Sequence, residues 1–253
     1  QQESLVYLDS MLQVKQKEFE AIKNKYTFEK NEEYQKIGNY FWPTQTVEKN
    51  LHRSFLRFQV NEQGVMTLTS IYCGPSNIHH VAVKVIAPDG SFAETPASND
   101  SYETTDLGEK IEKADYKMGE DGNVLSFLYM NRDKKNIRVE YLGERKFSTT
   151  MTPSDREALV GTYELAKLLS SIRQIQQEKE EANLKIEFVK IKIIKHPNCL
   201  FHHGLTDHTK YSSQAIVFIC PIRQSVVNSF RPIYFYPLRK GRPDYSPLSC
   251  RYQ

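Results

Sequence analysis

The residues best suited to chemistry gather after Lys195. Histidines and a cysteine lie close together there: His196, Cys199, His202, His203 and His208. Zinc takes four nitrogen or sulfur ligands, usually supplied as two separated pairs. Here the ligands fall in one short stretch, so Cys220 or Cys250 would complete a site only by folding back. A zinc or anion site in this segment is one hypothesis, and a histidine-rich loop is the simpler interpretation.

A second group of reactive residue types is Cys73 with His79 and His80. A thiolate nucleophile needs a base within hydrogen-bond reach and a third group to orient that base. The spacing predicts that the two histidines point to opposite faces of a strand, and nothing marks an orienting residue. We therefore expect Cys73 to be a small buried hydrophobic residue and predict no catalytic residues here.

Established catalytic and ligand-binding motifs are absent from the sequence. It contains no G-x-S-x-G, H-E-x-x-H, P-loop or G-x-G-x-x-G pattern. Glu120 and Asp121 precede Gly122 without the alternating oxygen ligands that calcium requires, so they indicate a turn. No cofactor and no metal ligand are predicted, and an enzyme would have to use dispersed residues on loops.

Charge divides the chain of 253 residues near Lys195. Residues 196–253 contain seven basic and two acidic side chains, a net charge of +5, and are rich in proline and aromatic residues. The stretch Arg231–Arg242 has the composition of an anion-binding segment, but the charge is too mild to predict nucleic-acid binding. We interpret this tail as irregular and not independently folded.

The elements that must position any site begin with two helices. A spacing of three and four predicts the first over Leu5–Lys36, through Leu5, Leu8, Leu12, Phe19, Ile22 and Tyr26. Thr152 or Ser154 and Pro153 predict the start of the second. Its apolar positions are Leu165, Leu168, Ile172, Ile175, Ala182, Ile186, Val189 and Ile193. Both carry the heptad pattern of a coiled coil.

Between the helices the period changes to two, which indicates strands. Alternation predicts strands at 51–60, 65–72, 80–86, 137–141 and 145–151, joined by short turns. Val124–Met130 is apolar on both faces and predicts a central strand. Thr95–Gly119 is polar and predicts a loop, with a helical turn near Glu109–Lys113.

The predicted fold class is α+β. It comprises an N-terminal helix (1–42), an antiparallel β-sandwich or barrel (43–151), a second long helix that pairs with the first (152–195) and the tail (196–253). The helices could form an antiparallel coiled-coil stalk, pack separately on the β domain, or self-associate with another subunit.

The functional expectation is a non-enzymatic binding or scaffold protein. The β domain would present a protein- or glycan-binding surface, with exposed aromatics such as Tyr72 or Tyr129. The sequence contains no run of about 18 apolar residues, so it predicts no transmembrane segment. The chain begins at Gln1, as a mature exported protein would, so we expect an extracytoplasmic location in the cell envelope, periplasmic or surface-exposed. The alternatives are an enzyme with a dispersed site on β-domain loops and a metal- or anion-binding tail.

Overall fold

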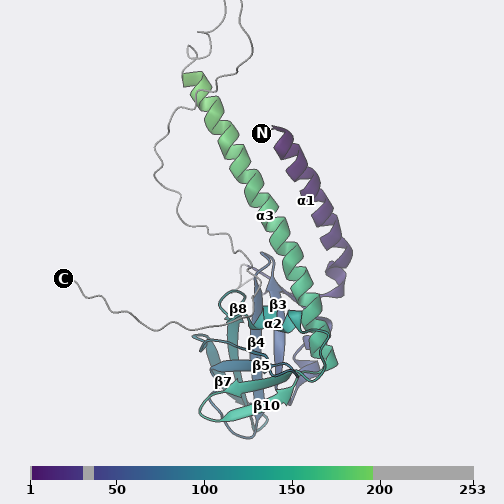
Figure 1. Cartoon of the computed structure of the whole chain (residues 1–253), viewed down its shortest axis with the longest axis vertical. Helices are drawn as coiled ribbons and strands as arrows, with labels where there is room; N and C mark the ends of the chain where they lie inside the picture. The colour runs from purple at the N-terminus through teal and green to yellow at the C-terminus, as the bar shows by residue number, and fades with distance from the viewer. Residues whose placement is uncertain (1, 31–36, 196–253) are drawn as a thin grey trace, which may run out of the picture. The chain divides into compact units, whose positions relative to one another are not determined.

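The computed structural model describes residues 2–30 and 37–195. The chain divides into two units, residues 1–202 and 203–253, and the description below concerns the first. The expectations for the tail, including Cys199, His202, His203, His208 and Arg231–Arg242, lie outside the described residues. The first unit is α+β, as predicted, and consists of two antiparallel sheets with α-helices (Figure 1).

The larger sheet has six strands in the order β1-β2-β3-β4-β8-β7. These are β1 (Thr27–Glu29), β2 (Asn39–Phe41), β3 (Phe55–Asn61), β4 (Met66–Gly74), β8 (Glu109–Lys117) and β7 (Ser101–Asp106). The smaller sheet has four, in the order β10-β9-β5-β6: β10 (Lys146–Thr150), β9 (Arg138–Leu142), β5 (Ala82–Ile86) and β6 (Phe92–Glu94). The predicted alternation in β4 is confirmed, because Met66, Leu68, Ser70 and Tyr72 are all buried.

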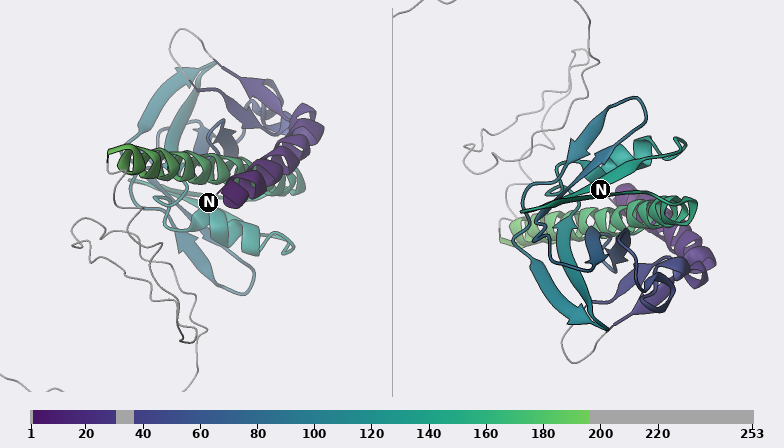
Figure 2. Two further views of the ribbon diagram at one scale, coloured as in Figure 1. Left: turned by 90° about the horizontal axis from the view of Figure 1, so that it is seen from above. Right: turned by 90° about the horizontal axis from the view of Figure 1, so that it is seen from below.

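The two sheets share a hydrophobic core with the helices. Phe58 and Met66 from the larger sheet, Val85 from the smaller one and Leu159 from the long helix are members of one buried cluster. In both views of Figure 2, strands lie on either side of the long helix ribbon. The core therefore fixes the position of the six-stranded sheet.

The predicted central strand at Val124–Met130 is wrong, because this segment is the helix α2 (Val124–Met130). Its buried residues are Val124, Leu125 and Leu128, which share one helical face. Asp121 accepts a hydrogen bond from the backbone N–H of Leu125 at 2.7 Å and starts the helix. An apolar run of seven residues fits a buried strand and a buried helix equally well.

The predicted loop at Thr95–Gly119 is also wrong, as is the helical turn near Glu109–Lys113. The strands β7 and β8 form a hairpin there, with Asp106 paired to Glu109. Leu107 and Gly108 form the turn with φ values of 48° and 85°. Such turns usually carry Asn-Gly, and a leucine with a left-handed φ is unusual. Because this turn has Leu-Gly instead, the sequence lacks the pattern that predicts a hairpin here.

The first helix is shorter than the predicted Leu5–Lys36. α1 (Gln2–Ile22) is followed by the 3₁₀ turn η1 (Lys23–Lys25) and then by β1. The hydroxyl of Tyr26 donates to the carbonyl of Gly161 at 2.8 Å, which holds the chain as it leaves the helix. The chain is thereby directed into the sheet edge.

The second helix, α3 (Pro153–Lys195), begins as predicted. The Thr152 hydroxyl accepts a hydrogen bond from the Asp155 N–H at 3.1 Å, and the Asp155 carboxylate accepts one from the Thr152 N–H at 3.2 Å. This reciprocal capping fixes the helix start. The last core residue of α3 is Leu169, so its remaining length lies outside the core.

The helices α1 and α3 run antiparallel (Figure 1). Two contacts link them: Tyr26, which follows α1 in the chain, bonds to Gly161 of α3, and Asp9 in the first half of α1 pairs with Lys179 of α3 at 2.5 Å. A cavity of about 320 Å³ separates them midway, with charged lining residues such as Lys15 and Lys167. No helix of the described residues is long and apolar enough to cross a membrane.

Candidate functional site

A buried polar network joins the six-stranded sheet to the segment before β5. Ser70 lies on β4, Glu112 on β8, and His80 in the segment before β5. The Nε2 of His80 lies 2.8 Å from the Ser70 hydroxyl, and its Nδ1 lies 3.0 Å from a Glu112 carboxylate oxygen. The sequence spacing does not reveal this network, because the three residues come together only when β4, β8 and the segment before β5 pack.

The Glu112 carboxylate also organises the backbone of the segment before β5. It accepts hydrogen bonds from the N–H groups of Ile78, His79 and His80, at 2.6, 2.9 and 2.8 Å. Burial raises the pKa of Glu112, but these donated bonds outweigh burial and its pKa is lowered. Burial also lowers the pKa of His80, so this imidazole is neutral at neutral pH.

The order of groups in this network is that of a hydrolase triad, with a hydroxyl, an imidazole and a carboxylate. However, Ser70, His80 and Glu112 are only 0%, 3% and 1% exposed. Neither of the two cavities described for this unit is lined by any of them. In this conformation, the network therefore joins β4, β8 and the segment before β5, and a substrate has no access to it.

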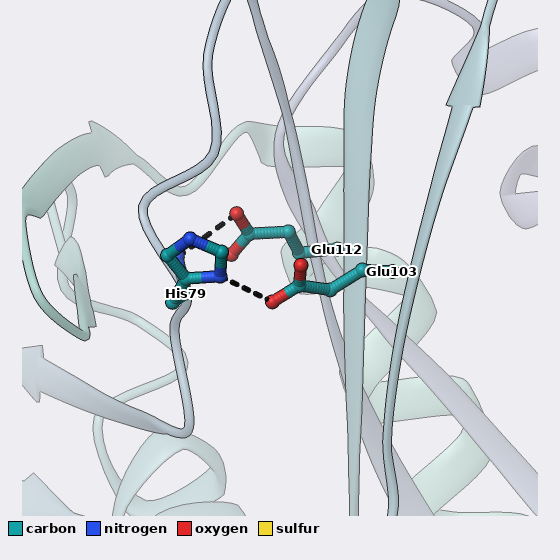
Figure 3. A group of neighbouring side chains, drawn as sticks. All are labelled: His79, Glu103 and Glu112. Atoms are coloured by element: carbon teal, nitrogen blue, oxygen red, sulfur yellow. Dashed lines mark hydrogen bonds and ion pairs between the residues drawn. The ribbon is translucent and has the colours of Figure 1, made fainter.

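A neighbouring cluster has the residue types of a metal site. His79, Glu103 and Glu112 each offer one ligand atom, and these atoms lie within 4.8 Å of one another (Figure 3). The His79 Nδ1 is already bonded to Glu103 at 2.8 Å, and this bond raises the pKa of His79. Both Glu112 oxygens accept hydrogen bonds from backbone N–H groups, so neither is left to bind a metal. The remaining pair, His79 with Glu103, is an ion pair that links β7 to the segment before β5.

A groove on the outer face of the six-stranded sheet is the larger open feature. Its volume is about 470 Å³. The register sets Phe55, Ile71, Lys113 and Tyr102 in one row across β3, β4, β8 and β7. Cys73, Ile111 and Thr104 form the next row. Val47, Leu51, His52 and Arg53, from the segment before β3, form the opposite wall.

The polar groups of the groove are mostly held in place. Glu109 bonds with His52 and accepts from the Cys73 thiol at 3.3 Å. Burial, and then Glu109, raises the pKa of Cys73 to about 11. Cys73 is therefore a protonated thiol at neutral pH, and neither His79 nor His80 is its partner. Arg53 is paired with Asp155 at the groove wall.

The predicted positions of several residues need correction. His79 and His80 precede β5 rather than lying within a strand. Tyr72 faces the core and is buried, and Tyr129 lies on α2, where it stacks on Tyr163 with ring centroids 4.0 Å apart. The exposed aromatic residues on the described strands are Phe28, Phe92 and Tyr102, and Tyr102 lies in the segment predicted as a loop.

The turn predicted at Glu120 and Asp121 is confirmed. Asp121 is buried, and its carboxylate accepts from the N–H groups of Gly119 and Leu125, at 3.1 and 2.7 Å. This carboxylate therefore caps the start of α2.

Comparisons of the chain with protein families, characterised proteins and solved structures found no match.

Proposed function

We propose that this is a non-enzymatic binding protein, and that it binds a segment of a partner protein in the groove on the six-stranded sheet. The observation that carries the proposal is the groove itself. Its volume of about 470 Å³ lies within the range of about 300–1,000 Å³ that is typical of ligand sites.

The lining favours a peptide over a glycan. Phe55, Ile71 and Ile111 supply an apolar floor, and Lys113 and Asp106 supply charges of both signs. Neither Lys113 nor Asp106 takes part in an ion pair among the described residues. Such a mixed surface suits alternating apolar and charged side chains.

The position of β7 supports an extended ligand. This strand pairs only with β8 in the part of the chain that the structure describes, so its outer edge presents free backbone groups. An extended peptide beside β7 would gain backbone hydrogen bonds and place alternate side chains beside Tyr102 and Thr104, at the rim of the groove.

In this proposal the two sheets act as an antiparallel sandwich, and α1 and α3 act as a coiled-coil stalk that positions it. The cell-envelope location also stays a prediction, which fractionation of cells that produce the full chain would test.

The test is a selection of random peptides displayed on phage against the full chain. Recovered peptides are then titrated against Thr104→Arg, which fills the groove, and against Ser148→Arg, a matched strand change in the other sheet. We expect at least tenfold weaker binding to Thr104→Arg and unchanged binding to Ser148→Arg. Equal binding to both variants, or no peptide above background, would refute the proposal.

The second candidate is a hydrolase that uses Ser70, His80 and Glu112 after the core opens. It rests on the 2.8 and 3.0 Å contacts of His80. A fluorophosphonate probe, which labels activated serines, distinguishes the two functions. Labelling of the wild-type chain that is lost in Ser70→Ala would favour the hydrolase, and the binding proposal expects no labelling.

A further inference from the structure

The register of the β7–β8 hairpin determines which backbone groups of β7 are directed away from β8. The Asp115 N–H donates to the Asp100 carbonyl at 3.0 Å. In an antiparallel pair, residues that bond to the neighbouring strand alternate with residues whose backbone groups point away from it. The even-numbered residues of β7 therefore bond to β8. The odd-numbered residues direct their N–H and C=O groups to the outer edge of the strand: Ser101, Glu103 and Thr105.

The side chains of the even-numbered residues form one row along the groove. Tyr102, Thr104 and Asp106 all line it, and Tyr102 is 60% exposed. Neighbouring members of the row are about 6.8 Å apart along the strand. A peptide strand that pairs with the outer edge of β7 has the same spacing, so every second side chain of the peptide lies beside one of these residues.

The two charges of the groove without an ion pair lie at opposite ends of this row. Lys113 of β8 is directly beside Tyr102, and Asp106 lies four residues further along β7. Asp115 follows Lys113 on the same face of β8, but its carboxylate accepts a bond from the Thr69 hydroxyl. The other basic side chains of the lining already have partners in ion pairs, namely His52 with Glu109 and Arg53 with Asp155.

We infer that the partner segment is an extended peptide with the pattern basic-x-apolar-x-acidic, bound antiparallel to β7. This inference rests on the proposed function and names the class of its ligand. Every pairing in the six-stranded sheet is antiparallel, and antiparallel pairing is slightly more stable per residue than parallel pairing. In this direction the peptide runs from Asp106 towards Tyr102.

Each position of the pattern has a partner in the groove. The basic side chain lies beside Asp106, within the reach of a cross-strand pair. The apolar side chain passes over Thr104, which is short, and reaches Ile111 in the apolar floor. The acidic side chain lies beside Tyr102 and meets Lys113 one strand further on. The backbones are then two strand spacings apart, about 9.6 Å, which a glutamate and a lysine side chain together can span.

The peptides selected on phage against the full chain give the first test. We expect the order basic-x-apolar-x-acidic to be enriched among them over the reverse order. Peptides that bind Thr104→Arg weakly, and so need the groove, but lack the pattern would overturn this inference and leave the proposed function standing. If no peptide is recovered, both are refuted.

The second test exchanges charges. The tightest recovered peptide is synthesised as found and with its basic and acidic residues exchanged, and both forms are titrated by fluorescence anisotropy. We expect the exchanged form to bind the wild-type chain at least tenfold more weakly, because two attractions become repulsions. The variant Asp106→Lys with Lys113→Glu should instead prefer the exchanged form. Asp106→Lys alone, at an exposed position, should discriminate at least threefold less than wild type, and it keeps the test decisive if the double variant does not fold.

Lys117→Glu with Glu120→Lys is the matched control, because it exchanges two exposed charges outside the groove and keeps the net charge. This variant should bind both forms of the peptide as the wild-type chain does. Equal affinity of the wild-type chain for the two forms, or an unchanged preference in Asp106→Lys, would overturn the inference.

Discussion

Removing the Glu112 carboxylate should destabilise the β unit strongly. Glu112→Ala deletes the acceptor of four hydrogen bonds, from the N–H groups of Ile78, His79 and His80 and from the His80 ring. Three of these donors belong to the buried residues Ile78 and His80. A buried donor without an acceptor costs about 1–3 kcal/mol, so the free energy of unfolding should fall by at least about 3 kcal/mol.

Glu112→Gln is the informative companion variant. Its amide oxygen can still accept from the Ile78 and His79 N–H groups, but its NH₂ group meets the His80 N–H, another donor. The His80 ring can adapt by changing tautomer, because the Ser70 hydroxyl can donate or accept. We therefore expect a smaller loss, of about 1–2 kcal/mol from one orphaned donor.

Urea unfolding followed by fluorescence measures both losses, because Trp42 is the single tryptophan. Glu103→Gln is the control, because Glu103 is an exposed member of the same cluster and should have little effect. A Glu112→Ala protein within about 1 kcal/mol of wild type, or equal losses for both Glu112 variants, would show that the hydrogen bonds do not hold this loop.

Three further expectations concern the same unit. Because burial lowers the pKa of His80, acid protonates its unfolded form first, so stability should fall as pH drops below about 6.5, by up to about 1.4 kcal/mol per pH unit. Glu103 raises the pKa of His79, so protonation of His79 has the opposite effect on stability. The pH dependence of unfolding in urea should therefore be compared between His79→Gln and His79→Gln/His80→Gln. The same change of stability with pH in both variants would refute the role of His80. Thr152→Ala should cost about 1 kcal/mol through loss of the α3 cap, and an unaltered urea midpoint would argue against that cap. Deleting residues 2–22 should lower the Tm, because Leu8, Phe19 and Ile22 lose their packing; calorimetry that finds the same Tm would mean that α1 does not brace the unit.

Local chemistry in the sequence predicted the features that depend on near neighbours. The alternation of Met66, Leu68, Ser70 and Tyr72 and the capping residues Thr152 and Asp155 act within one strand or one turn. These features are predictable from sequence, because within one strand or one helical turn the local geometry fixes which side chains face the core or meet each other.

Features that depend on long-range packing were not predictable from those patterns. The helix Val124–Met130 has no polar face that would reveal its period, and the hairpin of β7 and β8 has too few apolar residues to show alternation. Glu112 looked like an ordinary surface charge, because its partners lie more than 30 residues away in the chain. The groove arises only when β3, β4, β8 and β7 align.

The long helix also has a mechanical consequence. About 26 residues of α3 extend past Leu169, the last residue of that helix in the core, which is a rigid rod of about 39 Å. A tilt of about 10° where α3 meets the sheets would therefore displace its far end by about 7 Å. The pair of Asp9 with Lys179 restrains that tilt from α1. A small adjustment of packing near the core therefore becomes a large movement at the far end of α3.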